Sequence, residues 1–222
     1  MMVCLVTDRR RLGAAVGAGA DQWDDLLEQQ VRAAADVGVD LVQVRESGLN
    51  ARALTSLVRR LVKVCEGSPT RVVVNDRLDV AIAAGAAGVQ LKERSFSPDE
   101  ARRIAPPAFL IGCSVHSIAA AAARRSADFL IAGTVLPTAS KPNADYLEWK
   151  GLQQIVNAAA GTPVLGIGGL DVSSIPLLAK SCASGLAGIG VFIPGRGEAV
   201  TELIKKRMSE MRFAFDSVRG VP

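Results

Sequence analysis

Polar side chains that could hold an anion or a metal ion stand at the ends of two short apolar runs. Gln43 and Arg45 end one run, and their two-residue spacing puts both on the same side of a strand, where they could clamp an anion or a heteroaromatic ring. Asn75 and Asp76 end the next run, where an amide and a carboxylate could bind Mg²⁺ or a substrate amine. Two structural alternatives stay open: Arg45 could pair with Glu46, and Asp76 could cap a following helix.

A histidine ends another of these runs. Ser114 and His116 are two residues apart, so a strand would place both on one side. His116 is the only histidine in the chain, and an imidazole near neutral pH can both accept and donate a proton. We interpret His116 as the catalytic residue and Ser114 as a substrate-binding residue. A packed or solvated histidine is the alternative.

Glycines and hydroxyls in the last third of the chain indicate phosphate binding. Gly168, Gly169, Gly188 and Gly190 would let backbone amides approach a phosphate closely, although tight packing is another reason for glycine. One loop before them supplies two hydroxyls and an ammonium that could order a phosphate, or it could be a plain surface loop. Its residues are Thr138, Ser140 and Lys141.

Strands and helices must alternate to position these groups. Eight short runs are apolar almost without interruption, as parallel strands covered on both faces require. The expected strands are 3–7, 41–45, 71–75, 88–91, 110–115, 129–133, 163–167 and 186–191. Helical patterns lie between them at 23–37, 51–65, 77–84, 98–104, 118–125, 150–159, 172–180 and 197–213. We therefore predict one α/β domain over 1–222, a parallel (β/α)₈ TIM barrel with its chemistry at the C-terminal ends of the strands.

An open, doubly wound sheet is the rival architecture for eight such alternations. The glycine-rich stretch 13–19 follows a strand but lacks the spacing of a dinucleotide-binding turn. This absence favours the barrel. We expect the stretch to be a flexible first loop.

The composition and net charge of the chain exclude some classes of binding partner. Of the 222 residues, 49% are hydrophobic and 22% are charged, as in ordinary globular proteins, and the net charge is only +4. The basic runs lack interleaved aromatic residues, so we expect no nucleic acid partner. No long apolar stretch and no leader pattern occurs, so we expect no membrane span and no signal peptide. The four cysteines are widely spaced, which favours a reducing cytoplasm. A small anionic substrate is the expected partner, and a homodimer stays open.

Seven short motifs, in this order and at these spacings, resemble the thiamine phosphate synthase and TenI family, and the resemblance runs almost from end to end of the chain. They are LVTD at 5–8, QVRE at 43–46, VVVNDR at 72–77, GVQL at 88–91, IGCSVHS at 111–117, PTASK at 137–141 and PVLGIGGL at 163–170. The resemblance implies a barrel enzyme of thiamine biosynthesis that acts on a small phosphorylated heteroaromatic substrate.

Two activities occur in that family. Synthases join hydroxymethylpyrimidine diphosphate to thiazole phosphate with Mg²⁺, held by an aspartate matching Asp76 and by a second one where this chain has Ser95. They also carry a lysine two residues after the match to Arg45, where this chain has Ser47. TenI-type thiazole tautomerases shift a proton in a thiazole carboxylate phosphate without a metal, and carry a histidine matching His116.

The resemblance to the tautomerases also includes the stretch GVQL…SFSP. We therefore expect a thiazole tautomerase without a cofactor. A thiamine phosphate synthase with Mg²⁺ on Asp76 is the first alternative. A non-catalytic regulatory barrel that binds a phosphorylated ligand is the second.

Overall fold

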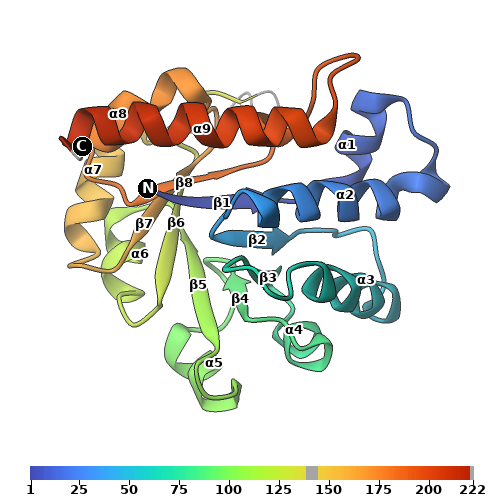
Figure 1. The fold of residues 1–222 in the computed structure, drawn as a ribbon. Coiled ribbons are helices and arrows are strands. Elements are labelled where there is room, and N and C mark those ends of the chain that lie inside the picture. Colours follow the sequence, from blue (N-terminus) through green and yellow to red (C-terminus); the bar gives the residue numbers. More distant parts are fainter. Residues whose placement is uncertain (139–144, 221–222) are drawn as a thin grey trace.

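Eight parallel strands close into a barrel in the computed structural model, which describes residues 1–138 and 145–220. Neighbouring strands pair in chain order, and β1 pairs with β8 to complete the ring (Figure 1). The predicted parallel (β/α)₈ barrel is confirmed. The strands are β1 (Met2–Val6), β2 (Leu41–Val44), β3 (Arg71–Asn75), β4 (Gly88–Leu91), β5 (Leu110–Val115), β6 (Phe129–Gly133), β7 (Val164–Ile167) and β8 (Gly185–Gly188).

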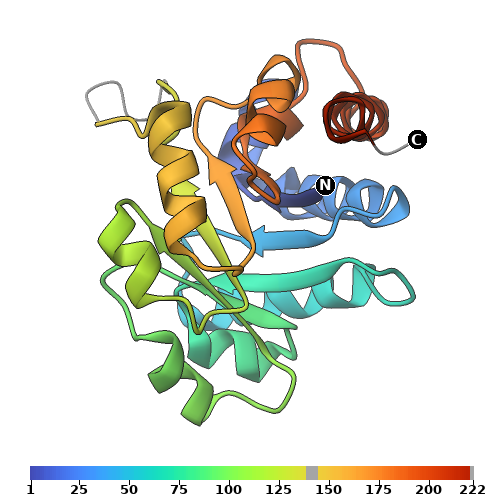
Figure 2. The same ribbon diagram turned by 90° about the vertical axis from the view of Figure 1, so that its left-hand side faces the viewer.

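Helices surround the ring of strands (Figure 2). The α-helices are α1 (Arg9–Val16), α2 (Trp23–Asp36), α3 (Ala51–Val64), α4 (Leu78–Ala84), α5 (Pro98–Ile104), α6 (Ile118–Ala123), α7 (Glu148–Ala158), α8 (Ile175–Lys180) and α9 (Val200–Arg219). The described residues also form three short 3₁₀ helices, η1 (Ala20–Gln22), η2 (Val172–Ser174) and η3 (Gly190–Phe192). Across 1–138 and 145–220, no helix is both long and apolar enough to cross a membrane.

The strands bury apolar side chains on both faces. Outward-facing residues such as Val72 and Val74 pack in the cluster that includes the helices, whereas Val73 between them points into the barrel. The small inner cluster consists of Cys4, Val6, Leu41, Val73, Phe129, Ile131, Leu165 and Ala187. Burial on both faces explains why the strand segments are apolar almost without interruption.

Strand β8 is shorter than predicted. The sequence pattern suggested 186–191, but the strand ends at Gly188 because Ile189 takes a helical backbone conformation and leads into η3. At the other end of β8, a Cβ on Gly185 would overlap the backbone of Met2. Glycine therefore permits the close approach of β8 to β1 that closes the barrel.

The prediction of a flexible loop at 13–19 is wrong for its first half, which lies in helix α1. The Asp8 side chain caps this helix by accepting a hydrogen bond from the Arg11 amide at 3.0 Å. Gly13 is buried against Trp23, and a Cβ there would overlap the indole ring. Gly17, in a left-handed conformation with φ of 74°, ends the helix. The glycines thus serve packing and capping.

Candidate active site

Two pairs of polar side chains line the inside of the barrel near the C-terminal ends of β2 to β5. Gln43 Nε2 donates a hydrogen bond to Asn75 Oδ1 at 3.0 Å, and Gln90 Nε2 donates one to Ser114 Oγ at 3.2 Å. Asn75 and Gln90 are also register partners across β3 and β4. The predicted residues Gln43, Asn75 and Ser114 are therefore brought together in one polar layer above the apolar inner cluster.

Gln90 belongs to this layer, although sequence reasoning did not select it. Its side chain is 1% exposed, and its Oε1 has no hydrogen-bond partner in the described part of the chain. The available signal was a lone amide between Val89 and Leu91 in an otherwise apolar strand. A buried amide side chain costs free energy unless it forms hydrogen bonds, so an amide in that place indicates a polar partner or ligand nearby.

Arg45 follows β2 and places a guanidinium at the rim that is unpaired within the described part of the chain. Its backbone amide donates to Thr7 Oγ1 at 3.0 Å, which ties the ends of β1 and β2 together. Its guanidinium is exposed and makes no hydrogen bond or ion pair with any residue of 1–138 or 145–220. The structure therefore does not show the Arg45–Glu46 pair considered above. The Arg45 side chain is available for an anion.

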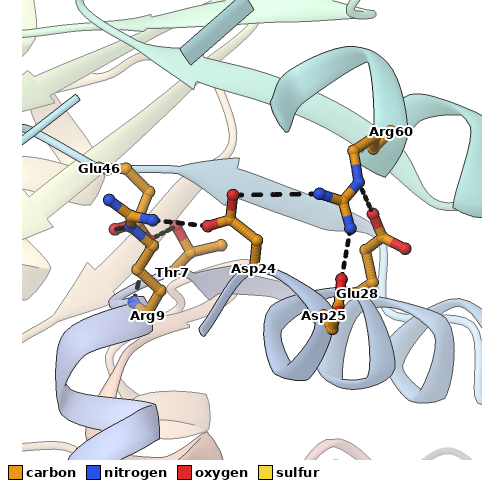
Figure 3. Close-up of polar contacts among 7 residues, drawn as sticks. All are labelled: Thr7, Arg9, Asp24, Asp25, Glu28, Glu46 and Arg60. Carbon is orange, nitrogen blue, oxygen red and sulfur yellow. Dashed lines mark hydrogen bonds and ion pairs between the residues drawn. The ribbon is translucent and has the colours of Figure 1, made fainter. Parts of the chain in front are cut away.

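Glu46 is instead held by a buried network (Figure 3). Its Oε1 accepts hydrogen bonds from Thr7 Oγ1 at 2.7 Å and from the Arg9 amide at 3.1 Å. The Arg9 guanidinium reaches Asp24 at 2.6 Å, and Asp24 in turn lies 4.0 Å from Arg60 on α3 (Figure 3). Burial raises the pKa of Glu46 more than the bonds from Thr7 and Arg9 lower it. This network fixes the start of α1 on the ends of β1 and β2.

Asp76 stands at the end of β3 in a strained conformation, with φ of 60°. A strained backbone conformation persists only where the surrounding structure holds it in place. Such conformations concentrate at functional sites. Its carboxylate lies 2.7 Å from Lys92 Nζ, and its amide donates to the Gln90 carbonyl at 2.8 Å. The N-cap residue of α4 is Arg77, which has no side-chain cap. Asp76 therefore does not cap that helix, contrary to the structural alternative.

The ionisation of Asp76 depends on its neighbours. Burial opposes the charged form, but hydrogen bonds from Lys92 and Ser95 outweigh it and hold the pKa below its ordinary value. A group with a depressed pKa stabilises the fold above its unfolded pKa, and this contribution is lost as the pH falls through the folded value. The carboxylate is therefore anionic at neutral pH.

Replacing Lys92 by methionine should raise the pKa of Asp76 towards its ordinary value, because the main cationic partner is lost. Since Lys92 is largely exposed, we expect a fall of at most about 1 kcal/mol in the free energy of unfolding at pH 7, and none at pH 2. Carboxyl NMR titration and urea unfolding measure the two effects. Lys92→Arg is the control and should keep the low pKa; an unchanged Asp76 titration in Lys92→Met would contradict the ion pair.

The oxygen donors around Asp76 suit Mg²⁺ in kind but are few. Asp76 and Ser95 supply a carboxylate and a hydroxyl that already contact each other. Among the described residues, no group of three or more His, Cys, Asp or Glu side chains could hold a metal ion. Mg²⁺ is commonly bound through one or two carboxylates together with substrate phosphates. These residues could therefore hold a Mg²⁺ that is also bound by a diphosphate. Without the metal, the Lys92 ammonium occupies the same carboxylate.

His116 follows β5 at the rim, exposed to solvent. Its Nδ1 contacts the Gly133 carbonyl oxygen, which can only accept, so Nδ1 carries the hydrogen and Nε2 keeps a free lone pair when the ring is neutral. The His116 amide donates to Glu93 at 2.8 Å, and Arg124 donates to the backbone carbonyl of Glu93. The charged loop after β4 is thus attached to the strand that carries His116.

Packing explains three of the four predicted phosphate-binding glycines in part, since a Cβ on Gly188 would come within 2.6 Å of Val191 Cγ1. Gly168 and Gly169 have φ of 101° and 68°, and a Cβ on Gly169 would come within 2.6 Å of the Pro137 carbonyl oxygen. The amides of Gly168, Gly169 and Gly190 donate to no other described residue, so they stay available to an anion. Gly188 ends β8 beside them.

The loop after β6 is described only in part. Thr138 is half-buried and already interacts with another part of the chain. Ser140 and Lys141 lie outside the described residues, so their proposed contact with phosphate stays a prediction.

Parallel (β/α)₈ barrels with polar groups at the C-terminal ends of the strands form a class of enzymes that place their active sites there. A family model described as thiamine monophosphate synthase matches residues 13–192. The chain belongs to this family, TMP-TENI, and is an enzyme of thiamine biosynthesis.

Relatives agree with that assignment. The chain is similar to the thiamine-phosphate synthase of Methanoculleus marisnigri, at 38% identity over 75% of this chain and 80% of the relative. It is also similar to that of Coprothermobacter proteolyticus, at 34% identity over 80% of this chain and 87% of the relative. A solved structure of thiamine phosphate pyrophosphorylase from Pyrococcus furiosus shares 29% identity, with a TM-score of 0.78 over 98% and 96% of the two chains.

These relatives support the synthase alternative better than the tautomerase that we expected. The expectation gave most weight to Ser47 and Ser95, which replace two groups that handle diphosphate in synthases. The structure shows that Lys92 places a cation beside Asp76. One missing carboxylate and one missing lysine are therefore weaker evidence against diphosphate chemistry than they seemed from the sequence.

Proposed function

We propose that this chain is a thiamine-phosphate synthase, a transferase that joins hydroxymethylpyrimidine diphosphate to thiazole phosphate and releases diphosphate. The named relatives support the reaction. The observation that carries it in this chain is the anionic, strained Asp76 at the end of β3, within 2.7 Å of the Lys92 ammonium. A carboxylate and a cation side by side suit a substrate that brings both Mg²⁺ and a diphosphate.

The residues around Asp76 would bind different parts of the first substrate, hydroxymethylpyrimidine diphosphate. The unpaired guanidinium of Arg45 and the ammonium of Lys92 would bind the diphosphate and stabilise its growing charge as it leaves. The hydrogen-bonded amides of Gln43 and Asn75 would orient the pyrimidine ring, with Ser114 farther along the same layer. Mg²⁺, held by Asp76 and the diphosphate, would supply further neutralisation of the leaving charge.

The second substrate would place its phosphate at the ends of β7 and β8. The free amides of Gly168, Gly169 and Gly190, with Gly188 adjacent, would donate to the phosphate oxygens. The sequence predicts further phosphate contacts from Thr138, Ser140 and Lys141, of which Ser140 and Lys141 lie outside the described residues. The two substrates would then meet across the polar layer inside the barrel.

The test is an assay of the purified chain with both substrates, with and without Mg²⁺. We expect thiamine phosphate and diphosphate to form in equal amounts, and a chelator to stop the reaction until Mg²⁺ is restored. Binding of both substrates without turnover would favour the non-catalytic regulatory barrel instead. Product formation that is indifferent to chelation would contradict the metal-assisted mechanism.

The free Nε2 of His116 favours thiazole tautomerase as a second candidate. A neutral imidazole with Nδ1–H held by the Gly133 carbonyl presents one basic nitrogen, as a proton shift on a bound ring requires. The same protein, given the non-aromatic thiazole carboxylate phosphate, would form the aromatic isomer without metal. Absence of this conversion in a preparation that makes thiamine phosphate would dismiss the second candidate.

A further inference from the structure

We propose that Arg11 on helix α1 is a side-chain ligand of the thiazole substrate's phosphate, an inference that rests on the phosphate position in the proposed function. The guanidinium lies against Gly190. A Cβ built on Gly190 would have Arg11 Nη2 at 3.0 Å and Nη1 at 3.6 Å. Both nitrogens therefore lie beside Gly190, whose backbone amide donates to no other described residue.

The Arg11 side chain has no polar partner among the described residues. It is exposed, and it forms no hydrogen bond or ion pair with residues 1–138 or 145–220. Its neighbour Arg9, in contrast, is bound to Asp24 and lies near Glu46. An unpaired guanidinium beside free amides offers what a phosphate dianion prefers: a planar fork of donors together with backbone N–H groups.

The backbone of Arg11 is held in place. Its amide donates to the Asp8 side chain at 3.0 Å. Two residues earlier, the Arg9 amide donates to the buried Glu46 at 3.1 Å (Figure 3). Gly13, one turn of helix from Arg9, packs against Trp23. Because α1 is fixed at its N-terminus and along its length, the backbone of Arg11 is already ordered before the substrate binds. This reduces the entropy cost of binding.

Arg10 provides a matched control within the same turn of helix. Its guanidinium lies near Gly48, after β2, where a Cβ would have Arg10 Nη2 at 2.6 Å. Arg10 and Arg11 are both exposed arginines, and they differ in the glycine that each approaches. Loss of either one changes the net charge of the protein equally. Only Arg11 should affect the phosphate.

The experiment measures binding of thiazole phosphate and of the corresponding thiazole alcohol by calorimetry, for the wild type, Arg11→Met and Arg10→Met. We expect Arg11→Met to weaken binding of the phosphate about 10- to 100-fold, as lost hydrogen bonds to a charged group do, with little change for the alcohol. Arg10→Met should bind both like the wild type. In the synthase assay, the loss should appear in KM more than in kcat.

Equal binding of the phosphate by Arg11→Met and the wild type would overturn the inference. So would equal losses for the phosphate and the alcohol, since that pattern means a general disturbance of the site. No phosphate binding by the wild type would also overturn it. If thiazole phosphate binds through Arg11 but no thiamine phosphate forms, the proposed synthase reaction fails and the Arg11 assignment stands.

Discussion

Replacement of Asp76 by asparagine should lower the turnover of thiamine phosphate synthesis by at least about 10²-fold, because removal of one group that stabilises transition-state charge typically costs about 10² to 10³ in kcat. The amide keeps the size of the side chain but cannot neutralise Mg²⁺ or pair with Lys92 at 2.7 Å. Since Asp76 is the single carboxylate that we assign to the metal, no neighbour should replace it.

Asp79→Asn is the matched control for this measurement. Asp79 is three residues away on α4 and is paired with Arg77 at 2.5 Å on the exposed surface. Its loss should leave turnover within about twofold, as for most surface substitutions. Steady-state kinetics over a range of Mg²⁺ concentrations gives both values. If Asp76→Asn retained normal turnover at saturating Mg²⁺, the assignment of Asp76 to the metal would be wrong.

Replacement of Glu46 by alanine should lower the free energy of unfolding by about 2 to 4 kcal/mol, which is a large effect for one side chain. The side chain is 6% exposed and accepts hydrogen bonds from the Thr7 hydroxyl and the Arg9 amide. Alanine would leave both donors buried without an acceptor and open a cavity between β1, β2 and α1. Urea unfolding monitored by circular dichroism measures the change.

Glu46→Gln separates the hydrogen bonds from the charge. The glutamine Oε1 can still accept from both Thr7 and Arg9, so at neutral pH we expect a loss of no more than about 1 kcal/mol. Equal destabilisation by alanine and glutamine would show that the charge near Arg9, at 3.7 Å from the guanidinium, matters more than the hydrogen bonds.

The direction in which the stabilities of the wild type and Glu46→Gln change with pH follows from the pKa of Glu46. Burial raises the pKa of Glu46 above its ordinary value of 4.5, so the folded state holds the proton more tightly than the unfolded state. The resulting stabilisation is complete below 4.5 and is lost as the pH rises through the raised value. The difference in the free energy of unfolding by which the wild type exceeds Glu46→Gln should therefore shrink as the pH rises from acid to neutral.

The barrel was predictable because its pattern is local. A strand buried on both faces must be apolar along its whole length, and a helix that covers it must be amphipathic, so the alternation at β1 to β8 is visible in the sequence. The closed parallel order then places every strand's C-terminal end on one side. The sequence therefore placed Gln43, Asn75 and Ser114 at one end of the barrel, where the strands carry their polar groups.

Helix α1 was not predictable by the same reasoning, because its stability comes from contacts outside it. Three arginines and a glycine-rich stretch carry no strong helical pattern. The helix forms because Asp8 caps it, Glu46 binds its first amide, and Gly13 packs closely on Trp23. Only the fold brings Glu46 to residue 9.

The electrostatic partners of the site were also decided by the tertiary structure. The sequence indicated Asp76 and Arg45 as charged groups near a substrate, but it left open whether Arg45 pairs with its neighbour Glu46. In the structure, Glu46 turns to Thr7, Lys92 pairs with Asp76 across 16 positions, and Arg11 faces Gly190. Residue types and strand period determine which groups stand at the mouth of the barrel. Which of them touch depends on loop paths and side-chain directions that only the complete packing sets.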